Sequence, residues 1–442
     1  MSGNPRLRSS RGKLSMMATV ALAACTTTQS ADAPIAGPVS GNTFVIRNVR
    51  VFDGSRTIER ANVVVRSGTI ASVGRSTGSP DLPVIDGESR TLIPGLIDAH
   101  AHIGSATNLR DALRFGVTTA LDMLSNISSV RDFKSQRTTS ARSDLADLYT
   151  AGSPVTSPRG LGTQFGIPFN TITSPDEAPA IVRGRIAEGS DYIKILYEPG
   201  APIFTTISRE TLAAVIAAAH AQSVMAVVHV SSLQGARDAV ATGADGLAHS
   251  FGDTVIDAAL AKDMAERGTF VIPTLSIFGA FQGKGVGSQL AADARLAPYL
   301  TPAQHKELVK VGPGPDHPLA PYLARFNVDQ ATRNVRQMHA AGVRILAGTD
   351  APNLGSHGVS LHGELELLVE AGLSPVEALT AATSGPARAF RLPDRGRITA
   401  GTRADLVLVD GNPMTDIKAT RSIVRIFKNG FEVSRTLPVA TR

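Results

Sequence analysis

The chain has 442 residues, of which 43% are hydrophobic and 5% aromatic, and it contains no tryptophan. This composition predicts a globular protein with an aliphatic core, large enough for one big domain and a smaller one, and excludes a disordered or fibrous chain. The net charge of +6 does not indicate a nucleic-acid partner, because most of it comes from four basic residues within the first 24, and no basic stripe remains elsewhere.

The first residues have the features of a bacterial lipoprotein signal. A basic segment precedes a short apolar run, Leu14–Ala24, which is too short to span a bilayer. Leu22-Ala23-Ala24-Cys25 resembles a lipobox, and Cys25 is the single cysteine, so no disulfide within the chain can form. We therefore expect a signal peptide over 1–24, lipidation at Cys25 and a flexible tether over 25–42. A plain secretory signal or a misassigned start codon is the alternative.

This signal predicts an exported lipoprotein, facing the periplasm or the cell surface, with the lipid anchor as its only membrane contact. A small-molecule substrate is the expected partner. A homo-oligomer is compatible with the sequence.

Short β-rich runs lie near both ends of the folded part of the chain. Asn429-Gly430 is a typical hairpin turn within the last of them. Two half-sheets at opposite ends usually form one β-domain around a large insertion, so we expect a composite β-sandwich from residues 43–92 and 393–442. The runs are Thr43–Val51, Asn62–Val65, Thr69–Val73, Arg397-Ile398, Ala404–Asp410 and Ser422–Val433.

Between these ends, apolar strand-like runs alternate with helical patterns, which favours an α/β fold with a (β/α)8 TIM-type barrel over residues 93–392. Eight strands are predicted, at Leu96–Ala101, Val117–Asp122, Leu145–Ala151, Tyr192–Leu196, Met225–His229, Gly246–His249, Thr269–Thr274 and Val343–Gly348. Helices are expected at Arg209–Ala221, Leu233–Thr242, Asp329–Ala341, Gly363–Ala371 and Pro375–Phe390.

The stretch 276–326 is too long for an ordinary connection and is rich in Gly and Pro. Such a segment on the C-terminal side of a barrel strand is commonly a lid or a substrate wall. We expect it to be a long irregular loop.

The stretch Thr91–Gly104 ends a buried strand with two histidines, His100 and His102. Alternate side chains of a strand point to the same side, so both imidazoles can reach one point. Two neutral imidazoles at that spacing form half of a site for Zn²⁺ or a similar ion. The H-x-H pattern alone is a weak signal.

Four further polar residues follow or interrupt apolar runs at the predicted C-terminal strand ends, where barrel enzymes place their chemistry. They are Lys194, His229, His249 and Asp350. Each has a structural alternative on its own; Lys194, for example, could pair with Asp191 or Glu198. An unpaired charge or imidazole is costly at such positions. The whole set therefore predicts one polar site at the barrel mouth.

The sequence motif PGLIDAHAH (Pro94–His102), followed in order by Lys, His, His and Asp, resembles the motif of the amidohydrolase superfamily. The later text HGELELLVEAGLSPVEALTAATSGPARAF resembles its imidazolonepropionase-like and metal-dependent (Xaa-Pro type) dipeptidase branch, and the resemblance covers roughly residues 43–433. It implies a barrel flanked by a composite β-sandwich and two divalent metal ions, usually zinc. By position, His100, His102 and Asp350 would bind one ion and His229 and His249 the other. Lys194, carboxylated by CO₂, would bridge them.

The function that this resemblance implies is hydrolysis of an amide bond in a dipeptide or an N-acyl amino acid. A metal-bridging hydroxide would attack, with Asp350 as general base and then general acid. A cyclic amide, carbamate, ester or lactone is the alternative substrate, and a binding protein with a dead barrel is an alternative of another class.

Other residues are expected to support this chemistry. Asp98 and Thr349 are candidates to orient the imidazoles. Tyr197, His317 and His362 are expected to contact substrate. A substrate carboxylate would need a cation, for which Arg159, Lys284 and Arg325 are loop candidates.

Overall fold

The structure is a computed structural model that describes residues 41–76, 80–166, 169–314 and 316–437. The predicted signal peptide, the lipidation site at Cys25 and nearly all of the tether lie outside the described residues, and they stay predictions. Within the described ranges no helix is both long and apolar enough to cross a membrane.

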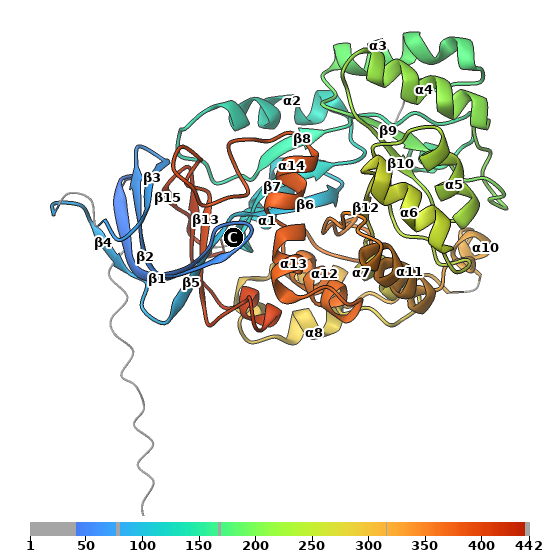
Figure 1. The fold of residues 1–442 in the computed structure, drawn as a ribbon. Helices are drawn as coiled ribbons and strands as arrows, with labels where there is room; N and C mark the ends of the chain where they lie inside the picture. The colour runs from blue at the N-terminus through green and yellow to red at the C-terminus, as the bar shows by residue number, and fades with distance from the viewer. Residues whose placement is uncertain (1–40, 77–79, 167–168, 315, 438–442) are drawn as a thin grey trace, which may run out of the picture. The chain divides into compact units, whose positions relative to one another are not determined.

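Strands from both ends of the chain form one eight-stranded sheet, in the order β15-β14-β13-β5-β1-β2-β3 with β4 beside β1. In Figure 1 the blue N-terminal strands lie beside the red C-terminal ones. The predicted hairpin turn is present, and both of its residues, Asn429 and Gly430, have positive φ as a tight two-residue turn requires. The strands are β1 (Phe44–Phe52), β2 (Thr57–Arg66), β3 (Thr69–Gly74), β4 (Val84–Asp86), β5 (Arg90–Pro94), β13 (Leu406–Asp410), β14 (Ile423–Lys428) and β15 (Phe431–Glu432).

The strand predicted at Arg397-Ile398 does not form. These two residues lie between Gly396 and Gly401, both at positive φ. The chain turns on either side, so these residues do not extend along a neighbouring strand.

The central part of the chain contains two parallel sheets. The first is β6 (Leu96–Ala101), β7 (Val117–Asp122) and β8 (Asp147–Thr150). The second is β9 (Ile193–Leu196), β10 (Ala226–His229), β11 (Gly246–Ala248) and β12 (Phe270–Ile272). Each lies within a predicted strand, and β6 and β7 have the predicted bounds. Almost every residue in them is buried, which explains why continuous apolar runs marked them in the sequence.

The eighth predicted strand, Val343–Gly348, is not a regular strand. Its hydrogen bonds are divided between two neighbours and do not form consecutive pairs with either. The amide of Leu346 donates to Val271 O at 2.8 Å, and the amide of Ala99 donates to Ala347 O at 2.9 Å. The segment nevertheless connects β12 with β6.

The other gap between the two parallel sheets is crossed by similar bonds. The amide of Val155 donates to Lys194 O at 2.8 Å, and the amide of Asp191 donates to Thr150 O at 2.8 Å. Backbone hydrogen bonds therefore run all the way around the parallel segments.

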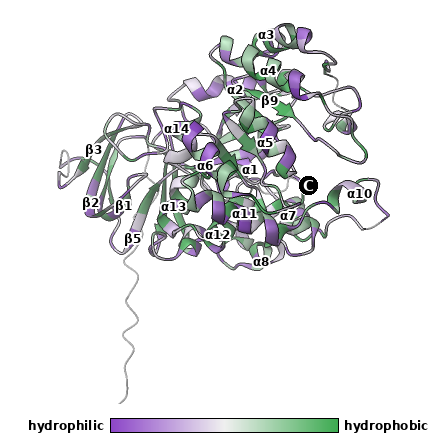
Figure 2. Ribbon diagram, turned by 45° about the vertical axis from the view of Figure 1, so that its right-hand side comes forward, coloured by the Kyte–Doolittle hydropathy of each residue, from purple (hydrophilic) through white to green (hydrophobic). Residues whose placement is uncertain are grey.

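Helices follow most of these strands, and in Figure 2 they carry hydrophobic and hydrophilic residues together, as expected of helices with one buried face. The predicted helix Pro375–Phe390 is two helices, because Thr383 has φ −138° and ψ −96° and breaks the run. The helices are α1 (Ala106–Arg114), α2 (Ile127–Ser135), α3 (Ala178–Glu188), α4 (Arg209–Ala221), α5 (Leu233–Ala241), α6 (Ala258–Arg267), α11 (Val328–Ala340), α12 (Val359–Glu370), α13 (Pro375–Ala381) and α14 (Ser384–Ala389).

Short helices take up about half of the stretch 276–326, so the prediction of an irregular loop was right only in part. The stretch contains α7 (Leu275–Phe281), α8 (Gly287–Ala292), α9 (Pro302–Leu308) and α10 (Ala320–Leu323). Local capping explains α9: the Thr301 side chain accepts from the Gln304 amide, and Pro302 occupies the first turn. The helices are too short to show a periodic pattern in the sequence.

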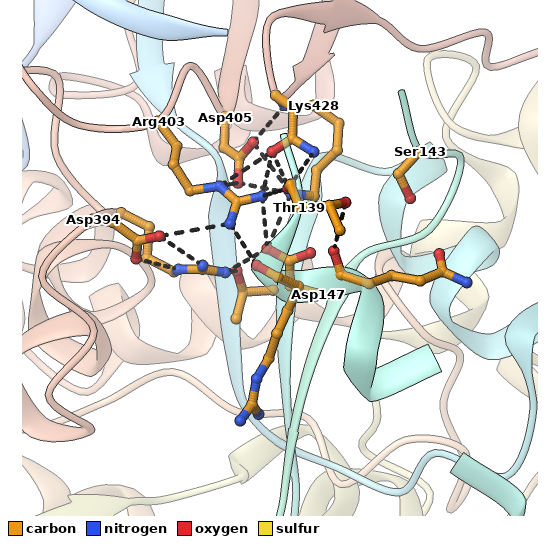
Figure 3. A network of polar contacts seen from close by, with 12 residues as sticks. Thr139, Ser143, Asp147, Asp394, Arg403, Asp405 and Lys428 are labelled. Atoms are coloured by element: carbon orange, nitrogen blue, oxygen red, sulfur yellow. Dashed lines mark hydrogen bonds and ion pairs between the residues drawn. The ribbon is translucent and has the colours of Figure 1, made fainter. Parts of the chain in front are cut away.

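A buried ionic network joins the eight-stranded sheet to β8 (Figure 3). Lys428 Nζ lies 3.0 Å from Asp147 Oδ2 and 3.1 Å from Asp405 Oδ2. Arg395 Nη1 also reaches Asp147 Oδ2, at 2.6 Å. Every one of these charges has a partner of opposite sign. The network is therefore a structural connection between the eight-stranded sheet and the parallel sheet that contains β8.

Candidate metal centre

His100 and His102, at the end of β6, converge on Asp350. Asp350 Oδ1 lies 3.0 Å from His100 Nε2 and 2.8 Å from His102 Nε2. Among the described residues these three form the group whose ligand atoms could surround one metal ion, all within 4.8 Å of one another. Alternation along β6 brings the two imidazoles to one side, and the positive φ of Asp350 turns its carboxylate toward them.

His229 and His249 complete a row of four imidazoles. The ring centroids of His100 and His249 are 4.6 Å apart, and those of His229 and His249 are 4.5 Å apart. These two histidines end or follow the neighbouring strands β10 and β11. The structure therefore gathers all four predicted histidines at the carboxyl ends of the parallel strands.

Lys194, in the middle of β9, faces this group. Its side chain is buried, and Nζ has no hydrogen-bond partner among the described residues. The alternative pairing with Asp191 or Glu198 is not present, because Asp191 is bound by Arg137 at 2.7 Å and Glu198 by His229 at 2.7 Å. Burial lowers the pKa of the Lys194 ammonium to about 7, although the carboxylates of Asp350 and Asp122 act in the opposite direction.

Apart from the contacts with Asp350, three of the four imidazoles have one ring nitrogen fixed by a neighbour. His249 Nδ1 lies 2.6 Å from Thr274 Oγ1, His229 Nε2 lies 2.7 Å from Glu198 Oε1, and His102 Nδ1 lies 3.3 Å from Leu124 O. Such contacts fix the orientation and tautomer of a metal-binding histidine. His229 Nδ1 and His249 Nε2 are thereby left for a ligand.

Thr274 and Glu198 were not predicted as orienting residues. Thr274 has a positive φ of 51° and is held by Glu364, which accepts from the amides of Leu275 and Ser276 at 3.0 and 2.8 Å. Burial raises the pKa of Glu364 to about 7.

Asp98 and Thr349 were predicted to orient the imidazoles, and both lie beside them. Thr349 Oγ1 donates to Asp98 Oδ2 at 2.7 Å, and Asp98 Oδ1 accepts from the backbone amide of His100 at 3.1 Å. Asp98 thus holds the backbone of the first histidine and not its ring. Burial raises the pKa of Asp98 to about 7.

Asp350 is ionised in this arrangement. Burial alone would raise the pKa of Asp350, but the hydrogen bonds from His100 and His102 hold it well below its usual range. Asn353 Nδ2 also donates to Asp350 Oδ2 at 3.0 Å. A carboxylate held in this way can bind a cation or accept a proton.

An open cavity of about 480 Å³ lies over these side chains and includes the six predicted metal-binding residues in its lining. His317, one of the expected substrate contacts, also lines it. The stretch 276–326 supplies much of the opposite side, including Phe278, Tyr322 and Phe326. The prediction that the stretch 276–326 forms a wall of the substrate site therefore agrees with the structure.

Tyr197 and His362 are not in the cavity lining, so the structure contradicts their prediction as substrate contacts. Lys194 and Leu196 line the cavity, whereas Tyr197, one residue on, points to the other side of the strand and donates to Asp238 Oδ2 at 3.0 Å. His362 lies within α12, where its two ring nitrogens are 3.0 Å from Phe115 O and 3.0 Å from Thr420 Oγ1.

Comparisons with known proteins agree with this site. The model of the amidohydrolase family matches residues 91–437, and the chain belongs to this family. As a member, it is a hydrolase that acts on carbon–nitrogen bonds.

Individual relatives are distant. The chain is 24% identical to an adenine deaminase of Lysinibacillus sphaericus over 88% of its length, but spans only 57% of that deaminase. It is 26% identical to an imidazolonepropionase of Streptomyces griseus, over 80% of this chain and 86% of that protein. A solved Xaa-Pro dipeptidase with bound methionine has a TM-score of 0.72 at 22% identity, over 89% of this chain and 100% of the other. That structural likeness shows the shared fold, and the branch that the sequence resembles is represented among these relatives.

Proposed function

We propose that the chain is a metal-dependent amide hydrolase with two divalent ions, zinc being the expected metal. The observation that carries this proposal is the buried amine of Lys194, without a partner among the described residues, beside four imidazoles and an ionised carboxylate. As in the sequence-based assignment, His100, His102 and Asp350 would hold one ion and His229 and His249 the other. The same proposal interprets the ring of parallel segments as a (β/α)8 barrel and the eight-stranded sheet as its composite β-sandwich companion.

The donor set suits this use. Imidazole nitrogen and carboxylate oxygen are common zinc ligands. A lysine ammonium would repel two dications, but the neutral amine favoured by burial can react with CO₂ to give a carbamate with two anionic oxygens. Carboxylated Lys194 would then offer one oxygen to each ion. Bound divalent ions supply activation of water and polarisation of a carbonyl group at neutral pH.

Asp350 supplies the proton transfer. Its carboxylate is ionised and lies at the cavity, so it accepts a proton from the attacking water. The protonated carboxyl group then gives this proton to the leaving amine. Asn353, which donates to Oδ2, holds the second oxygen in place during both steps.

The proposed substrate is a dipeptide or an N-acyl amino acid. The second candidate is an uncharged carbonyl compound, such as a cyclic amide, carbamate, ester or lactone. One observation favours an uncharged substrate: Arg159, Lys284 and Arg325, the expected partners of a substrate carboxylate, are absent from the described lining of the cavity.

The test is turnover of an amide library by the zinc-loaded protein and by Asp350→Asn. The asparagine keeps the size and a weak oxygen ligand but cannot accept the proton. We expect kcat to fall by about 10²–10⁴-fold, which is typical of general acid–base catalysis, with KM little changed and most metal retained. Turnover by Asp350→Asn within a few-fold of the parent would remove Asp350 from the mechanism.

A further inference from the structure

Five aromatic side chains form a continuous wall along the cavity, named here the aromatic wall: Phe204, Phe278, Phe281, Tyr322 and Phe326. Ring centroids are 4.9 Å apart for Phe278 and Phe326, 5.2 Å for Phe326 and Tyr322, and 5.4 Å for Tyr322 and Phe204. Phe278 also lies 5.9 Å from the ring of His249. Tyr322 Oη also lies 3.2 Å from His229 Nε2, so the aromatic wall runs beside two of the candidate metal ligands.

The entrance of the cavity is apolar as well. Phe165 and Val311 line it, although 55% and 77% of their surfaces are exposed. Large apolar side chains held open to water at the edge of a cavity are typical of a surface that meets an apolar ligand. Most other large side chains in the lining are aliphatic, among them Leu161, Leu196 and Leu323.

Cations for a substrate carboxylate are scarce in this cavity. Apart from histidines, the charged side chains in its described lining are Lys194, Asp350 and Glu307. Glu307 is an anion paired with Lys310, at 2.5 Å. His317 Nδ1 accepts a hydrogen bond from the Leu319 amide at 3.1 Å, so this nitrogen is not free to donate to a carboxylate.

The expected cations Arg159, Lys284 and Arg325 lie outside the described cavity lining. Lys284 Nζ donates to Asp329 Oδ2 at 2.6 Å. Arg325 Nη2 donates to Pro199 O at 3.4 Å, whereas its Nη1 has no hydrogen-bond partner among the described residues and lies 3.8 Å from Glu198 Oε2. A carboxylate placed against the aromatic wall would lose its hydration without gaining a partner, and that is costly.

We propose that this site takes an uncharged amide with an aromatic ring next to the scissile bond, and not a peptide with a free carboxylate. This inference rests on the proposed amide hydrolysis, and it favours an uncharged substrate over the dipeptide or N-acyl amino acid that the sequence resemblance implies. The ring would pack on Phe204, Tyr322 and Phe326, where offset and edge-to-face contacts between rings are favourable.

A pair of probe molecules tests whether the site prefers an uncharged ligand. The 4-nitroanilide of phenylacetic acid is uncharged, and its 3-carboxy-4-nitroanilide analogue differs by one carboxylate. Binding of each to the zinc-loaded Asp350→Asn protein is measured by calorimetry, so that the result does not depend on turnover. We expect the uncharged probe to bind at least about tenfold more tightly. Equal or tighter binding of the carboxylate, or no binding of either probe, would overturn the inference.

A matched pair of substitutions tests the aromatic wall. Phe204→Ala, added to Asp350→Asn, should weaken binding of the uncharged probe by about tenfold, because it removes one ring of the wall. Phe133→Ala is the control, since Phe133 in α2 is half-buried like Phe204 but does not line the cavity. Equal affinities in the two variants would contradict the inference.

Turnover of the same probes by the parent protein separates the two proposals. If the uncharged probe binds as expected but neither probe is hydrolysed, the hydrolase proposal fails and the binding inference stands. If the carboxylated probe binds and is hydrolysed better, the opposite holds.

Discussion

Lys194 and Lys428 are both enclosed by protein, with 2% and 0% of their surfaces exposed. Their surroundings differ. Lys428 Nζ has hydrogen-bond partners on Asp147, Asp405 and Asn429, all within 3.3 Å (Figure 3). Lys194 Nζ has none among the described residues.

The difference distinguishes a structural charge from a functional one. A buried ammonium is tolerated where carboxylates replace the water that it has lost, as they do around Lys428. Around Lys194 the neighbours are imidazoles and the carboxylates of Asp350 and Asp122, which already accept hydrogen bonds from other groups. The missing partner of Lys194 is therefore expected to come from outside the polypeptide.

The largest expected effect on stability is that of Lys428→Met. It leaves Asp147 and Asp405 short of a counter-charge in a buried site, and we expect the free energy of unfolding to fall by about 3–5 kcal/mol, measured by urea denaturation. Lys194→Met, measured on metal-free protein, should be neutral or stabilising, because it removes a buried amine that has no partner. If Lys194→Met destabilised as much as Lys428→Met, the distinction between the two lysines would be lost.

Lys418→Met is the matched control for this pair. The Lys418 side chain is 57% exposed and lies 3.8 Å from Glu366. Glu366 is buried but keeps Arg421 as its nearer partner, and the exposed Lys418 at this distance contributes about 0–1 kcal/mol, so this variant should unfold almost like the parent.

A smaller effect is expected from Thr274→Val. The substitution removes the hydroxyl that fixes His249 Nδ1, and loss of such a partner typically weakens metal affinity by about 10–100-fold. Competition with a chelator measures this. Thr420→Val is the control, because it removes the hydroxyl beside His362, which lies outside the cavity. Similar affinities in the two variants would show that Thr274 does not orient a metal ligand.

The effect that is smallest per pH unit concerns acid stability. Burial lowers the pKa of His362 to about 3, against about 6.5 for an unfolded chain, although the hydrogen bond with Phe115 O opposes this. As the pH falls from 6.5 toward 3, His362 is protonated in the unfolded state but stays neutral in the folded state, so the free energy of unfolding decreases. His362 contributes at most about 1.4 kcal/mol per pH unit to that slope.

His362→Gln should therefore make the loss of stability with falling pH shallower by up to that amount between pH 6.5 and 3. Urea denaturation at several pH values measures the slope. An unchanged slope would show that His362 is not held neutral in the folded chain.

Much of the site could be predicted because its residues follow apolar runs that form buried strands. The alternation of a strand places His100 with His102, and strand ends bring Lys194, His229 and His249 to the same edge. The same alternation places Glu198 on the side of the strand that carries Lys194, and Tyr197 on the opposite side. Glu198, and not Tyr197, is therefore the residue that reaches the site, where it contacts His229. That signal was in the sequence and was missed.

Other features depend on contacts that a sequence does not display. Thr274 adopts a positive φ because Glu364, from a distant helix, caps the turn after it. Val343–Gly348 is not a regular strand because its hydrogen bonds with β6 and β12 do not form consecutive pairs with either, and within this described segment only the isolated bridge of Ile345 with Val271 is made. His362 is a histidine, a residue type common in active sites, but it lies on a helix face that packs against Phe115 and Thr420.

The central claim is that Lys194 links two metal ions, and metal content tests it most directly. The parent and Lys194→Ala are loaded with zinc and bicarbonate, dialysed, and measured by mass spectrometry for metal per folded chain, with circular dichroism as the check of folding. We predict two ions per chain for the parent and well below two for Lys194→Ala. Two tightly held ions in Lys194→Ala, or none in the parent, would contradict the account.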